Sequence, residues 1–267
     1  MKRRVSVVVF LVLLLSFNSS QAQILKQIQK MAEQKALDKA SKKGNSGDNA
    51  EQNASMENAI LSYGKNKVDP SVVPNSYSFS WKYIMEIKTA DANAMNAEYF
   101  LEPNASYFAM NISQGEGQNM LMIMDSKNSI TVTCFGNGKE KMASASKMAD
   151  YSEMAKKESE KSKFTYKTLP NKTFLGYNCK GIQATNDEYD MIFYYTGDAK
   201  VSFGDMIKNQ KGWKMPDGLA SYFKPEDKTL LMDMTMKDLK SRKVTTMKCV
   251  SLEKNAFVFN KSDYKFM

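Results

Sequence analysis

The chain has 267 residues, a formal net charge of +9 and no histidine. The absence of histidine excludes Ser-His-Asp and Cys-His catalysis and the usual zinc sites, so we expect no enzyme activity and no cofactor. The lysines are spread along the chain among acidic residues, whereas a nucleic-acid-binding protein would more often concentrate them, so no nucleic-acid partner is expected.

The N-terminus predicts export. Three basic residues, Lys2 to Arg4, precede an apolar run from Val5 to Phe17, and Ser20-Gln21-Ala22 follows as a small-x-small cleavage site. This is the pattern of a secretory signal peptide, and the run is too short for a spanning helix. We therefore expect residues 1–22 to be removed near Ala22. No later apolar stretch is long enough to span a membrane, so the mature protein is expected to be periplasmic or secreted.

Residues 23–69 are expected to form a helical arm and a linker. Between Ile24 and Leu37 the apolar residues recur at spacings of three and four, which predicts an amphipathic helix from Gln23 to about Lys43. Asp69-Pro70 favours an extended entry into the next region. The segment is either a poorly ordered leader or an arm that packs on, or plugs, a domain spanning residues 70–267.

From Ser76 onward the apolar period changes to two. Alternation from Tyr77 to Ile87 is typical of a half-buried antiparallel strand. Further strands are expected at residues 94–101, 106–112, 119–124, 130–135, 164–168, 173–185, 189–195, 229–236 and 242–252, with a short closing strand at 257–259. Turns are expected at residues 186–188 and 238–241, and the close spacing of the strands suggests a meander.

An interior helix is expected to interrupt these strands. Between Lys141 and Ser162 the apolar residues Met142, Ala145, Met148, Ala149 and Ala155 form a stripe at helical spacing. A looser, partly helical stretch is expected at residues 201–223. The predicted fold class is therefore α+β and mainly β: a curved antiparallel sheet with an interior helix and an N-terminal helical arm.

Four segments between residues 75 and 265 stand in a distinctive order. They are the aromatic strand at 77–87, the run Met120–Asp125, the segment Lys172–Lys180 and the late hairpin that ends near residues 257–264. This order resembles a family of uncharacterised secreted bacterial proteins, similar to the LolA/LolB-like lipoprotein carriers, whose Gly-Tyr-x-Cys-Lys strand matches residues 176–180. The resemblance implies a half-barrel wrapped around one or more helices, with an apolar concave side, and no known activity.

The chain contains three cysteines, Cys134, Cys179 and Cys249. An odd count in an exported protein allows at most one disulfide and leaves a free thiol. Cys179 and Cys249 lie in late strand-like runs, and pairing them would close a loop of about 70 residues, worth roughly 4 kcal/mol. The alternative is that all three are small buried hydrophobic residues.

Methionine is unusually frequent, with 20 residues in the chain. Met120, Met122 and Met124 share one face of a predicted strand, and Met232, Met234 and Met236 share a face of another. Three interpretations stay open: an apolar core face, an adaptable apolar groove, and a soft-metal site in which thioethers bind Cu(I). Trp81, Tyr83 and Met85 could likewise line a ligand cleft or fill the core. These nine residues are the candidate ligand-binding set, and a metal is assigned only in the Cu(I) alternative, to Met120, Met122 and Met124.

The leading functional hypothesis is an exported, non-enzymatic binding or carrier module for a hydrophobic ligand: a lipid, an acyl chain or a lipoprotein segment. One alternative is a methionine-rich periplasmic Cu(I)-binding protein. Another is a structural or adaptor protein that docks a protein partner through its N-terminal helix.

Overall fold

The computed structural model describes residues 67–90, 92–113, 119–136, 141–148, 164–204, 222–223 and 227–267. These residues form one 12-stranded sheet and two short 3-10 helices, η1 (Pro70–Val72) and η2 (Lys261–Asp263). The strands are β1 (Ser76–Thr89), β2 (Ala92–Leu101), β3 (Tyr107–Ser113), β4 (Asn119–Asp125), β5 (Ile130–Gly136), β6 (Lys141–Lys147), β7 (Thr165–Phe174), β8 (Tyr177–Thr185), β9 (Tyr189–Thr196), β10 (Leu230–Asp238), β11 (Val244–Asn260) and β12 (Lys265–Phe266).

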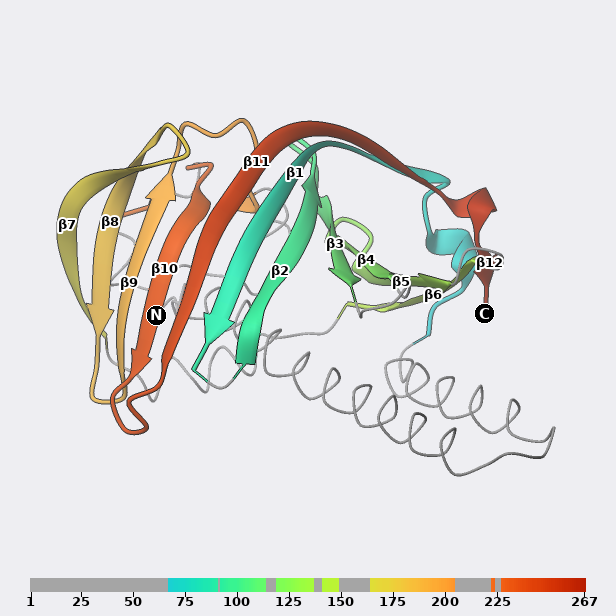
Figure 1. The fold of residues 1–267 in the computed structure, drawn as a ribbon. Coiled ribbons are helices and arrows are strands. Elements are labelled where there is room, and N and C mark those ends of the chain that lie inside the picture. The colour runs from blue at the N-terminus through green and yellow to red at the C-terminus, as the bar shows by residue number, and fades with distance from the viewer. Residues whose placement is uncertain are drawn as a thin grey trace, which may run out of the picture.

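The spatial order of the strands is β12-β6-β5-β4-β3-β2-β1-β11-β10-β9-β8-β7 (Figure 1). Neighbouring strands pair antiparallel, except that β12 runs parallel to β6. The predicted mainly-β class and the curved antiparallel sheet are confirmed. The signal peptide, the helical arm and most of the looser stretch at 201–223 lie outside the described residues, and so does the last part of the predicted interior helix.

The curvature is concentrated in the central pair β1 and β11. Their register shifts between Phe79 and Trp81 and again between Ile84 and Met85, and such bulges bend and twist the strands that carry them. The two strands arch together over β3 to β6 (Figure 1). Residues 257–259, predicted as a separate closing strand, are the end of β11, because the bulges let one strand turn the corner without a break.

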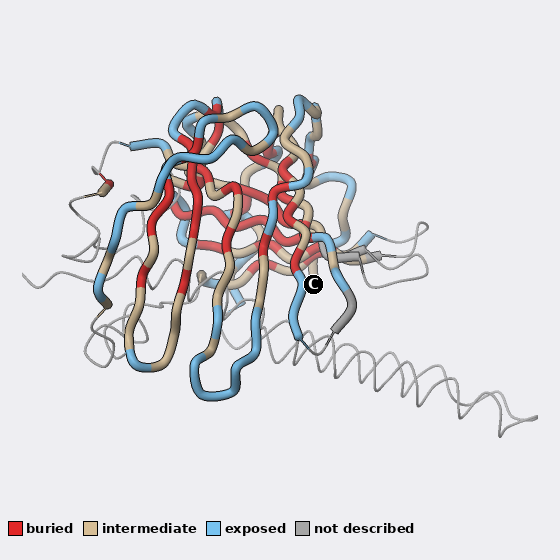
Figure 2. The backbone as a smooth tube through the Cα atoms, turned by 60° about the vertical axis from the view of Figure 1, so that its left-hand side comes forward, coloured by how far each residue is buried: buried red, intermediate tan, exposed pale blue. Residues whose placement is uncertain are grey.

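The sheet is buried on both faces at β3 and β4. Its concave face carries Tyr83, Met85 and Ile87, which belong to the larger core cluster, called here the concave cluster. A second, outer cluster fills the opposite face of β3 to β6, beneath the arched ends of β1 and β11. It contains Tyr77, Phe79, Phe259, Ala109, Ile123, Val132, Cys134, Ala143 and Ala145. Figure 2 shows that buried positions, in red, gather on neighbouring strands of the sheet.

A buried carboxylate fixes one end of the outer cluster. Asp125, at the end of β4, is 2% exposed and accepts a hydrogen bond of 2.9 Å from the Tyr77 hydroxyl. It also accepts from the backbone and side-chain nitrogens of Asn128 at 3.1 and 2.6 Å. Burial, followed by the negative charge of Asp125, raises the pKa of Tyr77 far above its usual value. The hydroxyl is therefore a permanent donor that ties β1 to the β4–β5 turn.

The two edges of the sheet differ. The β6 edge is covered by β12 and by an antiparallel bridge between Lys67 and Ser146. The opposite edge is β7, whose pairing with β8 is interrupted between Leu169 and Lys172. Pro170 lies in this interruption, where a residue without a backbone N–H is tolerated.

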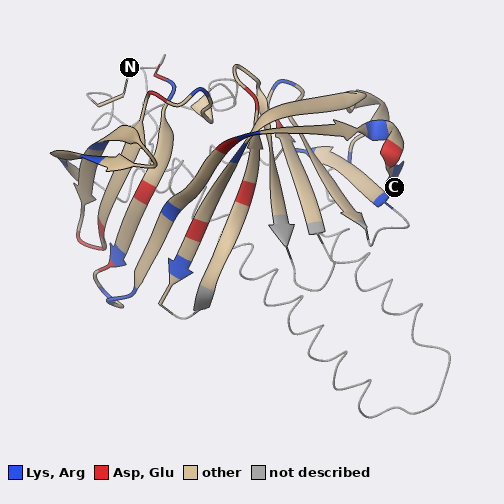
Figure 3. Ribbon diagram, turned by 45° about the horizontal axis from the view of Figure 1, so that its top comes forward, with Lys and Arg blue, Asp and Glu red and all other residues tan. Residues whose placement is uncertain are grey.

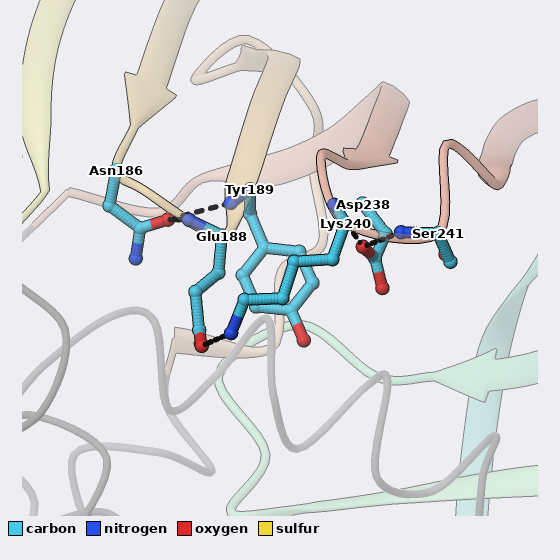
Figure 4. A network of polar contacts seen from close by, with 6 residues as sticks. All are labelled: Asn186, Glu188, Tyr189, Asp238, Lys240 and Ser241. Carbon is cyan, nitrogen blue, oxygen red and sulfur yellow. Dashed lines mark hydrogen bonds and ion pairs between the residues drawn. The ribbon is translucent and has the colours of Figure 1, made fainter.

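At one end of the sheet, two turns are joined to each other. In the β8–β9 turn the Asn186 side chain accepts from the backbone nitrogens of Glu188 and Tyr189, and in the β10–β11 turn Asp238 accepts from those of Lys240 and Ser241 (Figure 4). Such Asx turns explain why these short polar segments reverse the chain. Lys240 also forms an ion pair with Glu188, which links the two hairpins. Both predicted turns are confirmed.

The prediction of an interior helix is wrong for its first residues, Lys141 to Lys147. Lys141–Lys147 forms β6, which pairs with β5 so that Ala145 lies opposite Val132. The helix was predicted because alanine and methionine favour helices. The sequence Lys-Met-Ala-Ser-Ala-Ser-Lys, however, also alternates with the period of two that is typical of a strand. Burial of Ala143 and Ala145 against the outer cluster decided between the two patterns.

The strands predicted at 164–168 and 173–185 are instead a hairpin of β7 and β8 that turns at Leu175-Gly176. Both turn residues have positive φ, +49° and +82°, which is the geometry of a type I′ turn. This explains the Gly-Tyr-x-Cys-Lys segment: Gly176 makes the turn, Tyr177 begins β8, and Cys179 is buried. The turn was missed because leucine is rare at the first position, where asparagine is preferred.

Replacing Leu175 with asparagine should stabilise the protein. A leucine with positive φ is strained by about 1 kcal/mol, and asparagine relieves most of that strain. We expect a gain of up to about 1 kcal/mol in the free energy of unfolding, measured by urea denaturation. Leu239→Asn is the matched control, because Leu239 is also an exposed leucine in a turn. Leu239 is 39% exposed and Leu175 is 50% exposed, but Leu239 does not have a positive φ. An equal gain in both variants would contradict the strain argument.

Candidate functional site

The concave face presents a continuous apolar surface across the sheet. One cross-strand row runs through six neighbouring strands from β2 to β8, and every member is apolar. Its members, in spatial order, are Met95, Ile87, Met247, Met234, Phe193 and Ile182. All six belong to the concave cluster or pack against it, so the face is one surface rather than separate patches.

The nine candidate residues all lie on this concave face. Tyr83, Met85, Met232 and Met234 are at most 2% exposed. Met122 and Met124 are also buried, whereas Trp81, Met120 and Met236 are half-buried and pack against the concave cluster. The two methionine triplets stand on β4 and β10, with four strands between them, so strand pairing does not bring them side by side.

A segment that follows β9 covers part of this face. Ala199, Val201 and Phe203 are buried in the concave cluster, and so is Phe223 farther along the same connection to β10. The Phe203 ring contacts those of Tyr83, Tyr99 and Phe108. Sequence reasoning missed this cover, although the alternation of Ala199, Val201 and Phe203 was a usable signal for an extended, half-buried segment.

Two tyrosine hydroxyls of the concave cluster donate to backbone carbonyls. The Tyr83 hydroxyl donates to the Leu231 carbonyl at 2.6 Å, and the Tyr195 hydroxyl to that of Tyr222 at 3.5 Å. Burial raises the pKa of Tyr99 to about 12 and that of Tyr83 well above 10. These tyrosines are therefore neutral at physiological pH, and the face is suited to hydrocarbon rather than to an ion.

All three cysteines are free and buried, so the possible disulfide between Cys179 and Cys249 is not present in the structure. Both belong to the concave cluster, but they stand on β8 and β11, with β9 and β10 between them. The Cys249 thiol points toward the Ser251 carbonyl at 3.5 Å and that of Cys179 toward the Tyr177 carbonyl at 3.4 Å. The alternative prediction, that the cysteines act as small buried residues, fits this packing.

The thiols should be inert in the native protein. Burial raises the pKa of Cys134 and Cys249 to about 12, and burial also raises that of Cys179. A thiol with a pKa of 12 is about one part in ten thousand thiolate at pH 8, and only the thiolate reacts. Ellman's reagent at pH 8 should find no fast-reacting thiol in the native protein and three in guanidinium chloride.

The same pKa shifts fix the sign of the pH dependence. Because the folded thiol pKa lies above the unfolded value of 9, the thiol contribution to stability is complete below pH 9 and is lost as the pH rises toward 12. In the Ellman experiment described above, a fast-reacting thiol in the native protein at pH 8 would contradict the burial of all three cysteines.

Charged residues lie on the convex face. Lys82 lies opposite Glu253, and Lys248 lies between Glu86 and Asp233 in the strand pairing. Figure 3 shows acidic and basic residues interleaved along β10, β11, β1 and β2. The described residues contain no group of three or more His, Cys, Asp or Glu side chains that could hold a metal ion. The Cu(I) alternative, which uses methionines, stays a prediction.

Comparison with known proteins gives one family match. Residues 82–212 match the model described as "Domain of unknown function (DUF4412)", and this range includes the Gly-Tyr-x-Cys-Lys segment. The predicted resemblance to an uncharacterised family is thereby confirmed. None of the curated proteins compared with the chain matches it. None of the described residues forms a helix long and apolar enough to cross a membrane.

Three solved structures illustrate the more distant similarities. PNGF-II is 13% identical, with 70% of this chain and 30% of that chain covered and a TM-score of 0.37, so the chain spans under a third of its length. A putative outer membrane lipoprotein-sorting protein domain from Vibrio parahaemolyticus is 15% identical (66% and 86% covered, TM-score 0.25). The LolA superfamily protein NE2245 from Nitrosomonas europaea is 11% identical (68% and 88% covered, TM-score 0.17).

Proposed function

We propose that this protein is an exported, non-enzymatic binding or carrier module that holds a hydrophobic ligand, such as a lipid, an acyl chain or a lipoprotein segment, against the concave face of its sheet. The observation that carries the proposal is the unbroken apolar row across six strands. Part of that face is covered by a connecting segment rather than by a second sheet, and a connection is easier to displace than a hydrogen-bonded strand.

The chemistry of the face supports an apolar ligand. Its side chains are methionines, aromatic residues and aliphatic residues, and thioethers adapt to ligands of different shape. The hydroxyls of Tyr83 and Tyr195 already donate to the carbonyls of Leu231 and Tyr222, so these two groups are committed within the protein. A charged ligand group would find better partners at the rim or on the convex face.

Native mass spectrometry tests the proposal most directly. The full-length precursor would be expressed in a bacterial host, purified from the periplasm, and measured before and after extraction with organic solvent. A bound mass of several hundred daltons that extraction removes would support carriage of a lipid or acyl chain. A ligand-free mass in both samples, together with no displacement of a hydrophobic dye by fatty acids or phospholipids, would overturn it.

A further inference from the structure

The Phe203 ring lies among three other aromatic rings on the concave face. It contacts the rings of Tyr83 on β1, Tyr99 on β2 and Phe108 on β3, with centroid distances of 5.9, 5.5 and 5.1 Å. The interplanar angles are 69°, 82° and 88°, so Phe203 stands edge-to-face against all three rings. It is 6% exposed. A residue from outside the sheet therefore fills a site that three neighbouring strands build.

We infer that Phe203 is an internal occupant of the ligand site: its ring holds the place of one acyl chain of the ligand, which binds by exchanging with it. This inference rests on the proposed function and deepens it by naming the position and the ligand group. The three walls are aromatic, and the Tyr83 hydroxyl is already bonded to the Leu231 carbonyl. A polar headgroup buried there would lose its hydrogen bonds with water, whereas an alkyl chain would not.

The local backbone is suited to such an exchange. Residues 197–204 belong to no strand of the sheet. Two local hydrogen bonds shape the segment, from the Asp198 nitrogen to Thr196 Oγ1 at 3.1 Å and from the Gly204 nitrogen to Ser202 Oγ at 3.2 Å. The hydrogen bond from Gly204 to Ser202 lies within the segment that carries Phe203, so displacement of Phe203 does not break this bond.

The far end of the same connection has a different role. Phe223 packs on Tyr195 with 4.4 Å between ring centroids, and the Tyr195 hydroxyl donates to the neighbouring Tyr222 carbonyl. This combination of a ring contact and a hydrogen bond anchors the connection to β9. Neither of these two contacts involves Phe203, so the proposed exchange does not have to break them.

An internal competitor lowers the apparent affinity, because ligand binds only the fraction of molecules in which the site is vacant. The test measures binding of palmitate, by displacement of a fluorescent fatty acid, to the extracted wild-type protein and to F203A. We expect F203A to bind palmitate at least tenfold more tightly. F79A is the matched control, because Phe79 is also a buried phenylalanine but lies in the outer cluster, so its truncation should leave the affinity unchanged.

A second variant keeps the inference testable if F203A does not fold. F203C places a thiol at the exchanging position, and the three native thiols are buried. Palmitate should accelerate labelling of F203C by a maleimide, while wild-type protein stays unlabelled. If wild-type protein binds palmitate but neither F203A affinity nor F203C labelling changes, the inference is overturned and the proposed function stands. If no form binds palmitate or any phospholipid, both are overturned.

Discussion

Replacing Asp125 with alanine should lower the free energy of unfolding by about 3 kcal/mol, because the change leaves the Tyr77 hydroxyl buried without an acceptor. It also removes the acceptor for both Asn128 nitrogens, which shape the β4–β5 turn. Urea denaturation followed by far-ultraviolet circular dichroism would measure the loss.

The hydrogen-bond partner supplies the control. Tyr77→Phe removes the donor and keeps the ring packed against Tyr107 and Phe259, so we expect a smaller loss of about 1 kcal/mol. In the double variant the two losses should be less than additive, since both remove the same bond. A loss from Asp125→Ala no larger than that from Tyr77→Phe would contradict the assigned role of the carboxylate.

Replacing Gly181 with alanine should cost about 2 kcal/mol, although alanine is usually better than glycine inside a strand. A Cβ at Gly181 would lie 2.5 Å from Tyr194 Cε1 and 3.0 Å from Leu169 Cβ. The Tyr194 ring has little freedom to move, because it packs against Phe174 and the Lys172 ammonium group lies 4.7 Å above it. Thermal unfolding of the purified variant would measure the effect.

Gly197→Ala is the matched control for this prediction. A Cβ at Gly197 meets no atom within 4 Å, so this variant should be neutral or slightly more stable. Combining Gly181→Ala with Tyr194→Leu should restore part of the lost stability, because leucine does not reach as far as the tyrosine ring. Equal stability of Gly181→Ala and wild type would mean that β8 and β9 separate more easily than their close contact implies.

The strands that face a core on one side could be predicted from sequence. The alternation from Tyr77 to Ile87 gave β1 nearly to its ends, because its odd positions, apart from the half-buried Trp81, are buried and its even positions are more exposed. Periodicity could not show that β4 is buried on both faces, with Met122 and Met124 on one and Ile123 on the other. That depends on the β1–β11 arch folding back over the sheet, which is a contact between residues far apart in the chain.

The candidate site was predicted in composition but not in organisation. Methionine and aromatic residues with period two identified the side chains of the concave face. They could not give the strand order, which separates the Met120–Met124 and Met232–Met236 triplets. Phe203 was missed because the stretch from residue 201 onward was interpreted as partly helical, and because its importance arises from three strands that meet around it.

The unequal edges of the sheet bear on how the protein behaves at high concentration. Strand-by-strand addition of further copies, the first step toward a fibril, needs a straight edge with unpaired backbone groups. At β6 that edge is already occupied by β12 and by Lys67. At β7 an incoming strand would meet Pro170 and the charges of Lys167 and Lys172. The twelve-stranded sheet can therefore be present at high concentration without its edges serving as a template for polymerisation.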